Sequence, residues 1–134
     1  MRVRRYHTIK AWQLSDDLAI AIYHATNGLP EGERYGLVSQ MRRAYVSIAA
    51  NIAEGASRSS QREYLQFLYV ARGSLAELRY YLHLTKRLGY FSEDALKTQE
   101  ALGDEVGRVL FGLMKSVKDA IRVKEDPALL STAV

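Results

Sequence analysis

Residues 35–55, YGLVSQMRRAYVSIAANIAEG, form the stretch that decides the fold. Apolar side chains recur along it at spacings of three and four residues, which predicts an amphipathic helix that packs in a helical bundle. This apolar stripe consists of Leu37, Met41, Tyr45, Ile48 and Ile52. A second, polar stripe consists of Gln40, Arg43, Ser47, Asn51 and Glu54. Polar groups repeated along a whole helix predict either buried hydrogen bonding or a face that meets other chains.

The same kind of spacing predicts a helix before this one in the sequence and another near the end of the chain. The first runs from about residue 11 or 15 to residue 26, and its apolar face consists of Leu14, Leu18, Ala21 and Ala25. The fourth opens at Ser92 and continues to about Arg122, with an apolar stripe of Leu102, Val106, Leu110, Leu113 and Val117. Asn27-Gly28 ends the first helix, and Gly55 is expected to end the second.

The third helix begins at Ser60, where the sequence SQRE at 60–63 is a capping box, and runs to about Leu88 before Gly89. Its heptad seam consists of Tyr64, Leu68, Ala71, Leu75, Leu78, Leu82 and Thr85. A parallel stripe of Phe67, Val70, Ser74, Glu77, Tyr81, Leu84 and Leu88 lies beside it. Two adjacent seams imply more than one neighbouring helix, and this favours self-association.

Helices of this length joined by short turns pack mostly antiparallel. The predicted fold is therefore all-α: an up-down-up-down four-helix bundle over residues 11–122, a single domain. Residues 1–10 are expected to form a basic arm, and residues 123–134 a flexible tail.

Charge is unevenly distributed in this chain of net charge +4. Residues 1–10 hold four basic and no acidic side chains, and residues 34–87 hold nine basic and three acidic ones. This asymmetry suggests a polyanionic partner, although oppositely charged segments of one protein also pair with each other. The chain has no cysteine and no apolar run long enough to span a membrane, so it is expected to be cytoplasmic.

Several short motifs occur in an order that resembles a known family. They are YGL at 35–37, QMRRA at 40–44, Ser47-Ile48, NIAEG at 51–55, Arg58, Glu63, Phe67, ARGSL at 71–75, Glu77 and LGY at 88–90. The chain is thereby similar to the four-helix-bundle proteins encoded in intervening sequences of bacterial 23S rRNA genes. More distantly, it resembles the accessory variability determinants of diversity-generating retroelements. The arginine-rich start departs from the family, which more often has an aromatic-Asp-Leu sequence there.

The resemblance implies a cytoplasmic, ring-like homopentamer of four-helix bundles. For the more distant relatives it also implies a basic surface that binds nucleic acid and a reverse transcriptase or other ribonucleoprotein partner.

The remaining face of the third helix is basic and is the candidate nucleic-acid surface. Arginine binds phosphate in a bidentate manner, and an exposed tyrosine stacks on bases. The candidate contacts on this face are Arg62, Tyr69, Arg72 and Arg79, and Arg42 and Arg43 of the second helix are expected nearby in the bundle. The plain alternative is a solvated helix face. No motif that reads bases is present, so binding to RNA or DNA is expected to be mainly electrostatic.

The polar residues Gln40, Ser47, Asn51, Glu54 and Glu77 are interpreted as a structural network that sets helix register or subunit packing. A catalytic role is less favoured. No glutamate is followed three residues later by histidine, as a dimetal site in a bundle requires. No enzymatic activity, metal or cofactor is expected. Gly73 is expected to allow close helix approach and Gly55 to cap its helix.

Three roles stay open for Arg2, Arg4, Arg5, Tyr6 and His7. They are a nucleic-acid-binding arm, an arm that pairs with the acidic first helix of a neighbouring subunit, and a terminus without a role. Two functions are weighed for the whole chain. The first is a non-enzymatic oligomer that binds nucleic acid. The second is a protein-interaction scaffold in which the same arginines pair with Asp16 and Asp17 of neighbouring subunits.

Overall fold

The computed structural model of the chain describes residues 5–132. Its long helices are α1 (Lys10–Thr26), α2 (Leu37–Ala56), α3 (Gln61–Arg87) and α4 (Lys97–Glu125). The short 3-10 helices are η1 (Tyr6–Thr8), η2 (Glu31–Glu33), η3 (Asp94–Leu96) and η4 (Pro127–Thr132). Residues 5–132 contain no strand, so the all-helical prediction with four long helices is confirmed.

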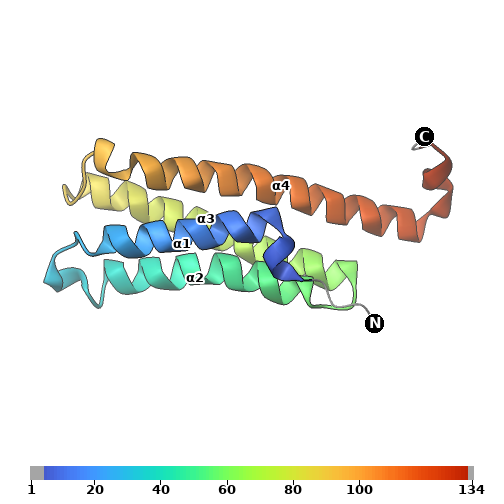
Figure 1. Cartoon of the computed structure of the whole chain (residues 1–134), viewed down its shortest axis with the longest axis horizontal. Coiled ribbons are helices and arrows are strands. Elements are labelled where there is room, and N and C mark those ends of the chain that lie inside the picture. Colours follow the sequence, from blue (N-terminus) through green and yellow to red (C-terminus); the bar gives the residue numbers. More distant parts are fainter. Residues whose placement is uncertain (1–4, 133–134) are drawn as a thin grey trace.

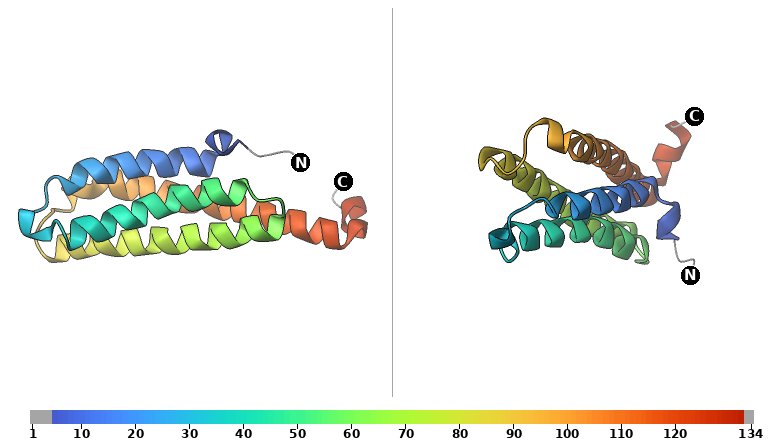
Figure 2. Two further views of the ribbon diagram at one scale, coloured as in Figure 1. Left: turned by 90° about the horizontal axis from the view of Figure 1, so that it is seen from below. Right: turned by 60° about the vertical axis from the view of Figure 1, so that its left-hand side comes forward.

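The four long helices form a bundle in which each has extensive contact with two others (Figure 2). α1 and α3 each contact α2 and α4, and the α2–α3 contact is the most extensive. The chain reverses direction after α1, α2 and α3, so that the start of α1 and the end of α4 lie toward the same end of the bundle (Figure 1). Because α3 contacts α2 and α4 separately, the α3–α4 edge and the α2–α3 edge are distinct.

The core between α2 and α3 is formed by the two apolar stripes that the sequence predicts. All five residues of the α2 stripe and all seven of the α3 seam are buried. The seam's terminal residue, Thr85, is polar, and its hydroxyl donates to the carbonyl oxygen of Leu82 at 2.7 Å. This hydrogen bond offsets the cost of burying the hydroxyl.

The core face of α1 differs from the predicted one. The buried residues are Ala11, Ser15, Leu18, Ile22 and Thr26, whereas Leu14, Ala21 and Ala25 are only half-buried. The buried face is therefore rotated from the predicted one, and Leu18 is the residue that the two faces share. The Ser15 hydroxyl donates to the Ala11 carbonyl oxygen at 2.7 Å, which satisfies a serine inside the core.

The helix α4 also differs in its start and its core face. It begins at Lys97 rather than Ser92, because η3 precedes it and the Ser92 hydroxyl accepts from the Ala95 amide at 3.2 Å. Its buried face consists of Gly103, Val106, Leu110, Met114 and Val117, and the predicted Leu102 and Leu113 are half-buried. At its other end α4 includes residues 123–125, and η4 follows.

Helix ends agree with the predicted caps at α3 and disagree at Gly55. The Ser60 hydroxyl accepts from the Glu63 amide at 3.1 Å, and Gly89 follows the helix with φ of +79°, a conformation that favours glycine. Gly55 lies inside α2, where it is the point of close approach to α3: a Cβ there would lie 2.7 Å from Phe67 Cβ. Gly73 has open space around it, so the roles predicted for these two glycines were wrong.

Candidate nucleic-acid interface

The predicted basic face of α3 lies along its edge with α4, and three of its cations bind carboxylates of that region. Arg62 pairs with Glu125, and Arg79 pairs with Asp104. The third, Lys86, has its Nζ 2.5 Å from Glu100 Oε1. The charges of these side chains are therefore largely matched within the chain.

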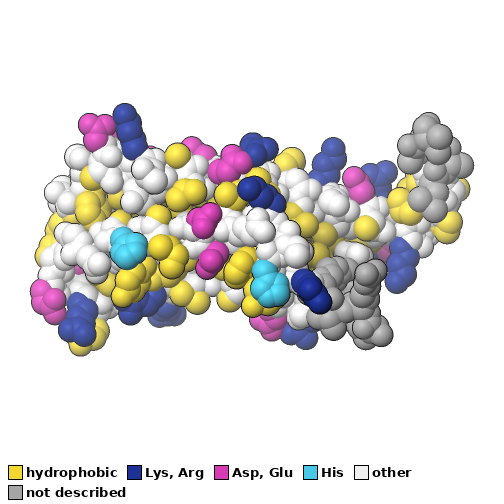
Figure 3. Space-filling model, in the orientation of Figure 1, with side chains coloured by type: hydrophobic (Ala, Val, Ile, Leu, Met, Phe, Trp, Pro, Cys, Tyr) yellow, Lys and Arg dark blue, Asp and Glu magenta, His cyan; other side chains and the backbone are white. Residues whose placement is uncertain are grey.

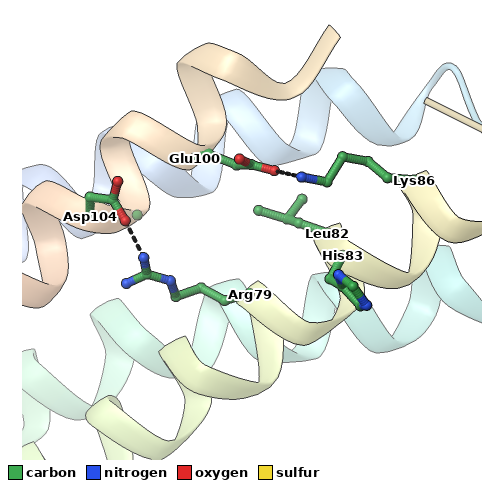
Figure 4. A pocket seen from close by; sticks show the side chains of 7 residues that line it. Arg79, Leu82, His83, Lys86, Glu100 and Asp104 are labelled. Atoms are coloured by element: carbon green, nitrogen blue, oxygen red, sulfur yellow. Dashed lines mark hydrogen bonds and ion pairs between the residues drawn. The ribbon is translucent and has the colours of Figure 1, made fainter. Parts of the chain in front are cut away.

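A hollow of about 220 Å³ lies on this edge between two of the ion pairs. Figure 4 shows Arg79 reaching Asp104 and Lys86 reaching Glu100, with Leu82 between them and His83 turned away. The hydrogen bond to Glu100 is the main cause of the raised pKa of Lys86. Because two carboxylates face two cations here, the hollow offers little net charge to an anion.

The other half of the α3–α4 edge carries cations around an aromatic ring. The Tyr69 ring centre lies 5.1 Å from the Arg72 guanidinium carbon and 5.5 Å from Lys118 Nζ. Arg72 comes from α3 and Lys118 from α4, so this contact joins the two helices. Both distances are typical of cation–π interactions, which hold the cations in place without neutralising them.

Lys118 belongs to a stripe along α4 that follows the spacing of four and three residues. It consists of Arg108, Phe111, Lys115, Lys118 and Arg122. Two contacts fix how α3 and α4 line up: Arg79 pairs with Asp104, and Tyr69 lies by Lys118. Along the helices, Arg72 is therefore level with the part of α4 between Asp104 and Lys118, which contains Phe111 and Lys115. Figure 3 shows Lys and Arg side chains projecting along the edge that α4 forms.

We call this set of side chains the α3–α4 cluster; its members are Tyr69, Arg72, Phe111, Lys115 and Lys118. Sequence reasoning missed Phe111, Lys115 and Lys118. Their spacing in the sequence is a usable signal, but only the register of α3 against α4 places them level with Tyr69 and Arg72.

Among residues 5–132, Arg72, Lys115 and Lys118 form no ion pair. Arg108 and Arg122, the first and last residues of the α4 stripe, each have a carboxylate partner instead. Arg108 binds Glu105, whose pKa is lowered mainly by that hydrogen bond, and Arg122 lies 3.6 Å from Asp119. The α3–α4 cluster is thus a local concentration of unmatched positive charge.

Arg42 and Arg43 lie on α2, away from this cluster. The Arg42 guanidinium carbon is 5.8 Å from the centre of the Tyr23 ring on α1. Arg43 faces the other way, toward α3, where its charge acts on Tyr81. The six candidate contacts therefore do not share one surface.

The predicted polar network lies along the α2–α3 contact. The Ser47 and Ser74 hydroxyl oxygens are 2.7 Å apart, and Asn51 Nδ2 donates to the Ser47 carbonyl oxygen at 2.8 Å. Further along, the Tyr81 hydroxyl donates to Glu77 Oε1 at 2.9 Å, and Gln40 Oε1 lies 3.5 Å from the same hydroxyl.

Glu54, at the end of the polar stripe, is bound separately from these residues. Glu54 binds Arg58 at 2.8 Å within its own stretch of chain rather than joining the network. The hydrogen bond to Glu77 is the main cause of the raised pKa of Tyr81. Because the stripe binds within the chain, it can set the register of α2 against α3 without a partner.

The short helix η1 packs against the first turn of α1. The Tyr6 ring stacks on His7 with centres 4.5 Å apart and meets Trp12 edge-on at 5.0 Å. Gln13 Nε2 donates to the His7 carbonyl oxygen at 2.8 Å. Arg2 and Arg4 of the predicted arm lie outside the described residues.

In the part of the chain that the structure describes, no group of three or more side chains that could hold a metal ion comes together. None of the described helices is both long and apolar enough to cross a membrane.

Comparison with known proteins identifies a family and a similar solved structure. Residues 7–112 match the model of the 23S rRNA-intervening sequence protein family. The fold resembles a crystal structure of a protein of unknown function from the S23 ribosomal protein family of Bacteroides thetaiotaomicron. The TM-score is 0.71 at 22% identity, over 78% of this chain and 95% of that one. Among curated proteins, none matches.

Proposed function

Because this chain belongs to the 23S rRNA-intervening sequence protein family, we propose that it is a non-enzymatic cytoplasmic protein that binds nucleic acid, RNA foremost. The observation that carries the proposal is the unmatched positive charge of the α3–α4 cluster. Arg72, Lys115 and Lys118 face solvent without a carboxylate partner among the described residues. Phosphate groups are the partners that such a cluster binds by charge.

The three expected arginines of α3 differ in whether a carboxylate already binds them. Arg62 and Arg79 bind Glu125 and Asp104, so a phosphate would have to compete with a carboxylate already in place. Arg72 has no such competitor. The proposal therefore assigns the main phosphate contacts to Arg72 and to the lysines of α4.

The test is the salt dependence of binding to a labelled RNA, measured by fluorescence anisotropy. Replacing Arg72, Lys115 and Lys118 together by glutamine should lower the affinity and reduce the slope of log K against log salt by about 2, since each phosphate contact on a single strand contributes roughly 0.7. The matched control replaces Arg34, Arg87 and Lys97 by glutamine at the other end of the bundle. Equal effects of the two triple variants, or binding insensitive to salt, would refute the proposal.

Assembly into a ring-like homopentamer of antiparallel bundles is part of the proposal, and a protein-interaction scaffold is its alternative. Exposed apolar side chains on α1 and α2 favour self-association: Ile20, Tyr23 and Val46 are about half exposed or more. Tyr23 on α1 lies beside Arg42 on α2. Ile20 is one turn before Tyr23 and Val46 is one turn after Arg42, so Ile20 and Val46 are level with each other where the two helices run in opposite directions. Figure 3 shows hydrophobic side chains on the face that carries α1.

Light scattering after size-exclusion chromatography separates these alternatives. A pentamer that carries nucleic acid at ~0.1 M salt and releases it at ~1 M supports the full proposal, because screening weakens phosphate contacts over that range. A pentamer free of nucleic acid at both salts supports the scaffold, with Arg42 or Arg43 paired to Asp16 and Asp17 of a neighbour. A reverse transcriptase or other ribonucleoprotein is the proposed protein partner.

A further inference from the structure

The α3–α4 cluster contains two aromatic side chains in opposite environments. Phe111 is 69% exposed, although a phenylalanine gains by leaving water. Tyr69 is half-buried, packs against the hydrophobic core and has two cations near its ring. These environments suggest different tasks for the two rings.

Tyr69 is suited to positioning rather than to stacking. Arg72 and Lys118 approach its ring from different helices, which orients both cations toward the same edge of the bundle. A base that stacked on Tyr69 would have to displace these cations from the ring. Tyr69 was expected to be the stacking residue, and this geometry favours Phe111 instead.

Phe111 is placed where a base would meet it. It lies one helical turn from Lys115 and two turns from Lys118 on the same stripe, and level with Arg72 across the α3–α4 contact. A strand whose phosphates follow these cations would carry its bases past the exposed ring. Aromatic rings stack on any base, so such a contact does not depend on sequence.

We infer that the cluster binds unpaired, single-stranded nucleic acid in preference to a duplex, with one base stacked on Phe111. In a duplex the base faces are covered by their neighbours, so a surface phenylalanine cannot reach them. This inference rests on the proposed function and names its substrate class.

The experiment compares two labelled probes at ~0.1 M salt: an unstructured 20-nucleotide RNA and the same RNA annealed to its complement. The wild-type protein should bind the single strand more tightly. Phe111→Ala should weaken single-strand binding by about 5-fold or more, since a stacked base contributes roughly 1–3 kcal/mol, and should leave duplex binding within about 2-fold. The slope of affinity against salt should not change, because no charge is removed.

Two further variants keep the test specific. Phe111→Trp should retain single-strand affinity, whereas Phe111→Leu, which is apolar but has no ring, should not. The control is Tyr80→Ala, which removes an aromatic side chain that is 56% exposed near His83 and should leave both affinities unchanged.

The outcomes distinguish this inference from the proposed function. Salt-dependent binding with equal affinity for both probes, or a Phe111→Ala variant that binds like wild type, overturns the inference alone. Wild-type affinity for the single strand in Phe111→Leu also overturns it, because the side chain would then act as an apolar contact that needs no ring. A change in particle mass on replacing Phe111 overturns it as well, because Phe111 would then lie in a contact between subunits. Absence of binding to either probe refutes the proposed function itself.

Discussion

The hydroxyl oxygens of Ser47 on α2 and Ser74 on α3 lie 2.7 Å apart, 27 positions from each other in the sequence. Asn51 reinforces this contact by donating to the Ser47 hydroxyl at 3.0 Å. A hydrogen bond between two small side chains lets the helices approach closely while keeping polar groups satisfied at a half-buried position. It therefore opposes sliding of α2 along α3.

Removing either serine hydroxyl should destabilise the protein in a non-additive way. Ser47→Ala and Ser74→Ala should each lower the free energy of unfolding by about 0.5–1.5 kcal/mol, the usual net contribution of one hydrogen bond. The double variant should lose less than the sum, because both changes remove the same bond. Urea unfolding of the four proteins in this cycle measures the coupling. Strict additivity would mean that the two hydroxyls do not interact.

Alanine at Gly55 and at Gly73 should have opposite effects. At Gly55 the new Cβ would lie 2.7 Å from Phe67 Cβ, so α2 and α3 must move apart, at a cost of about 1–3 kcal/mol. At Gly73 nothing lies within 4 Å, and replacing a helical glycine by alanine should stabilise by up to about 1 kcal/mol. Thermal or urea unfolding of Gly55→Ala, Gly73→Ala and the wild type measures both changes in stability. A stabilised Gly55→Ala protein would contradict the close helix contact.

Ser60→Ala should remove the N-cap of α3. The Ser60 hydroxyl accepts from the Glu63 amide at 3.1 Å, and loss of such a cap costs about 0.5–2 kcal/mol. Ser59→Ala, one residue outside the cap, should change stability by less than about 0.5 kcal/mol. Equal unfolding midpoints for the two variants would show that the cap does not contribute.

Stability at alkaline pH should depend on Tyr90. Its hydroxyl donates to Glu33 Oε2 at 2.7 Å, and this hydrogen bond is the main cause of a pKa raised above the ordinary value of 10.0. The folded state therefore holds the tyrosine proton more tightly than the unfolded state. The resulting stability is fully present below pH 10 and is lost as the pH rises through the folded-state pKa.

Tyr90→Phe should show a shallower loss of stability above pH 10 than the wild type. The Tyr81 pKa is also raised, by its hydrogen bond to Glu77, so Tyr81→Phe should reduce the same loss and the double variant should reduce it further. Urea midpoints between pH 8 and about 11 test this. Parallel curves for wild type and Tyr90→Phe would rule out the Glu33 contact as the cause.

The accuracy of sequence reasoning varied with the helix. In α3 the apolar seam contains only residues that are apolar or, like Thr85, able to satisfy their own polar group, so periodicity located the buried face correctly. In α1 the buried face includes Ser15, and an alternative set of alanines and leucines competed with it in the pattern. Hydropathy cannot decide between two such faces when a serine bonds to its own helix.

The candidate interface was less accessible to sequence reasoning. Four of the expected contacts lie on one face of α3 and two lie on α2, and the sequence does not show which side chains face them from the neighbouring helices. Glu125 and Asp104 match the charges of Arg62 and Arg79, while Phe111 and Lys118 extend the surface beyond Arg72. Which cations remain unmatched depends on the register of α3 against α4, and no motif in either helix encodes that register.

By itself, the sequence determined the helical class, the number of long helices, the cap at Ser60 and the family, because these depend on local periodicity, capping chemistry and short motifs. Only the tertiary structure decided which glycine makes a close contact, which face of α1 enters the core and which cations stay unpaired. Each of these depends on side chains far apart in the chain, and distances between helices are set by packing of the whole bundle.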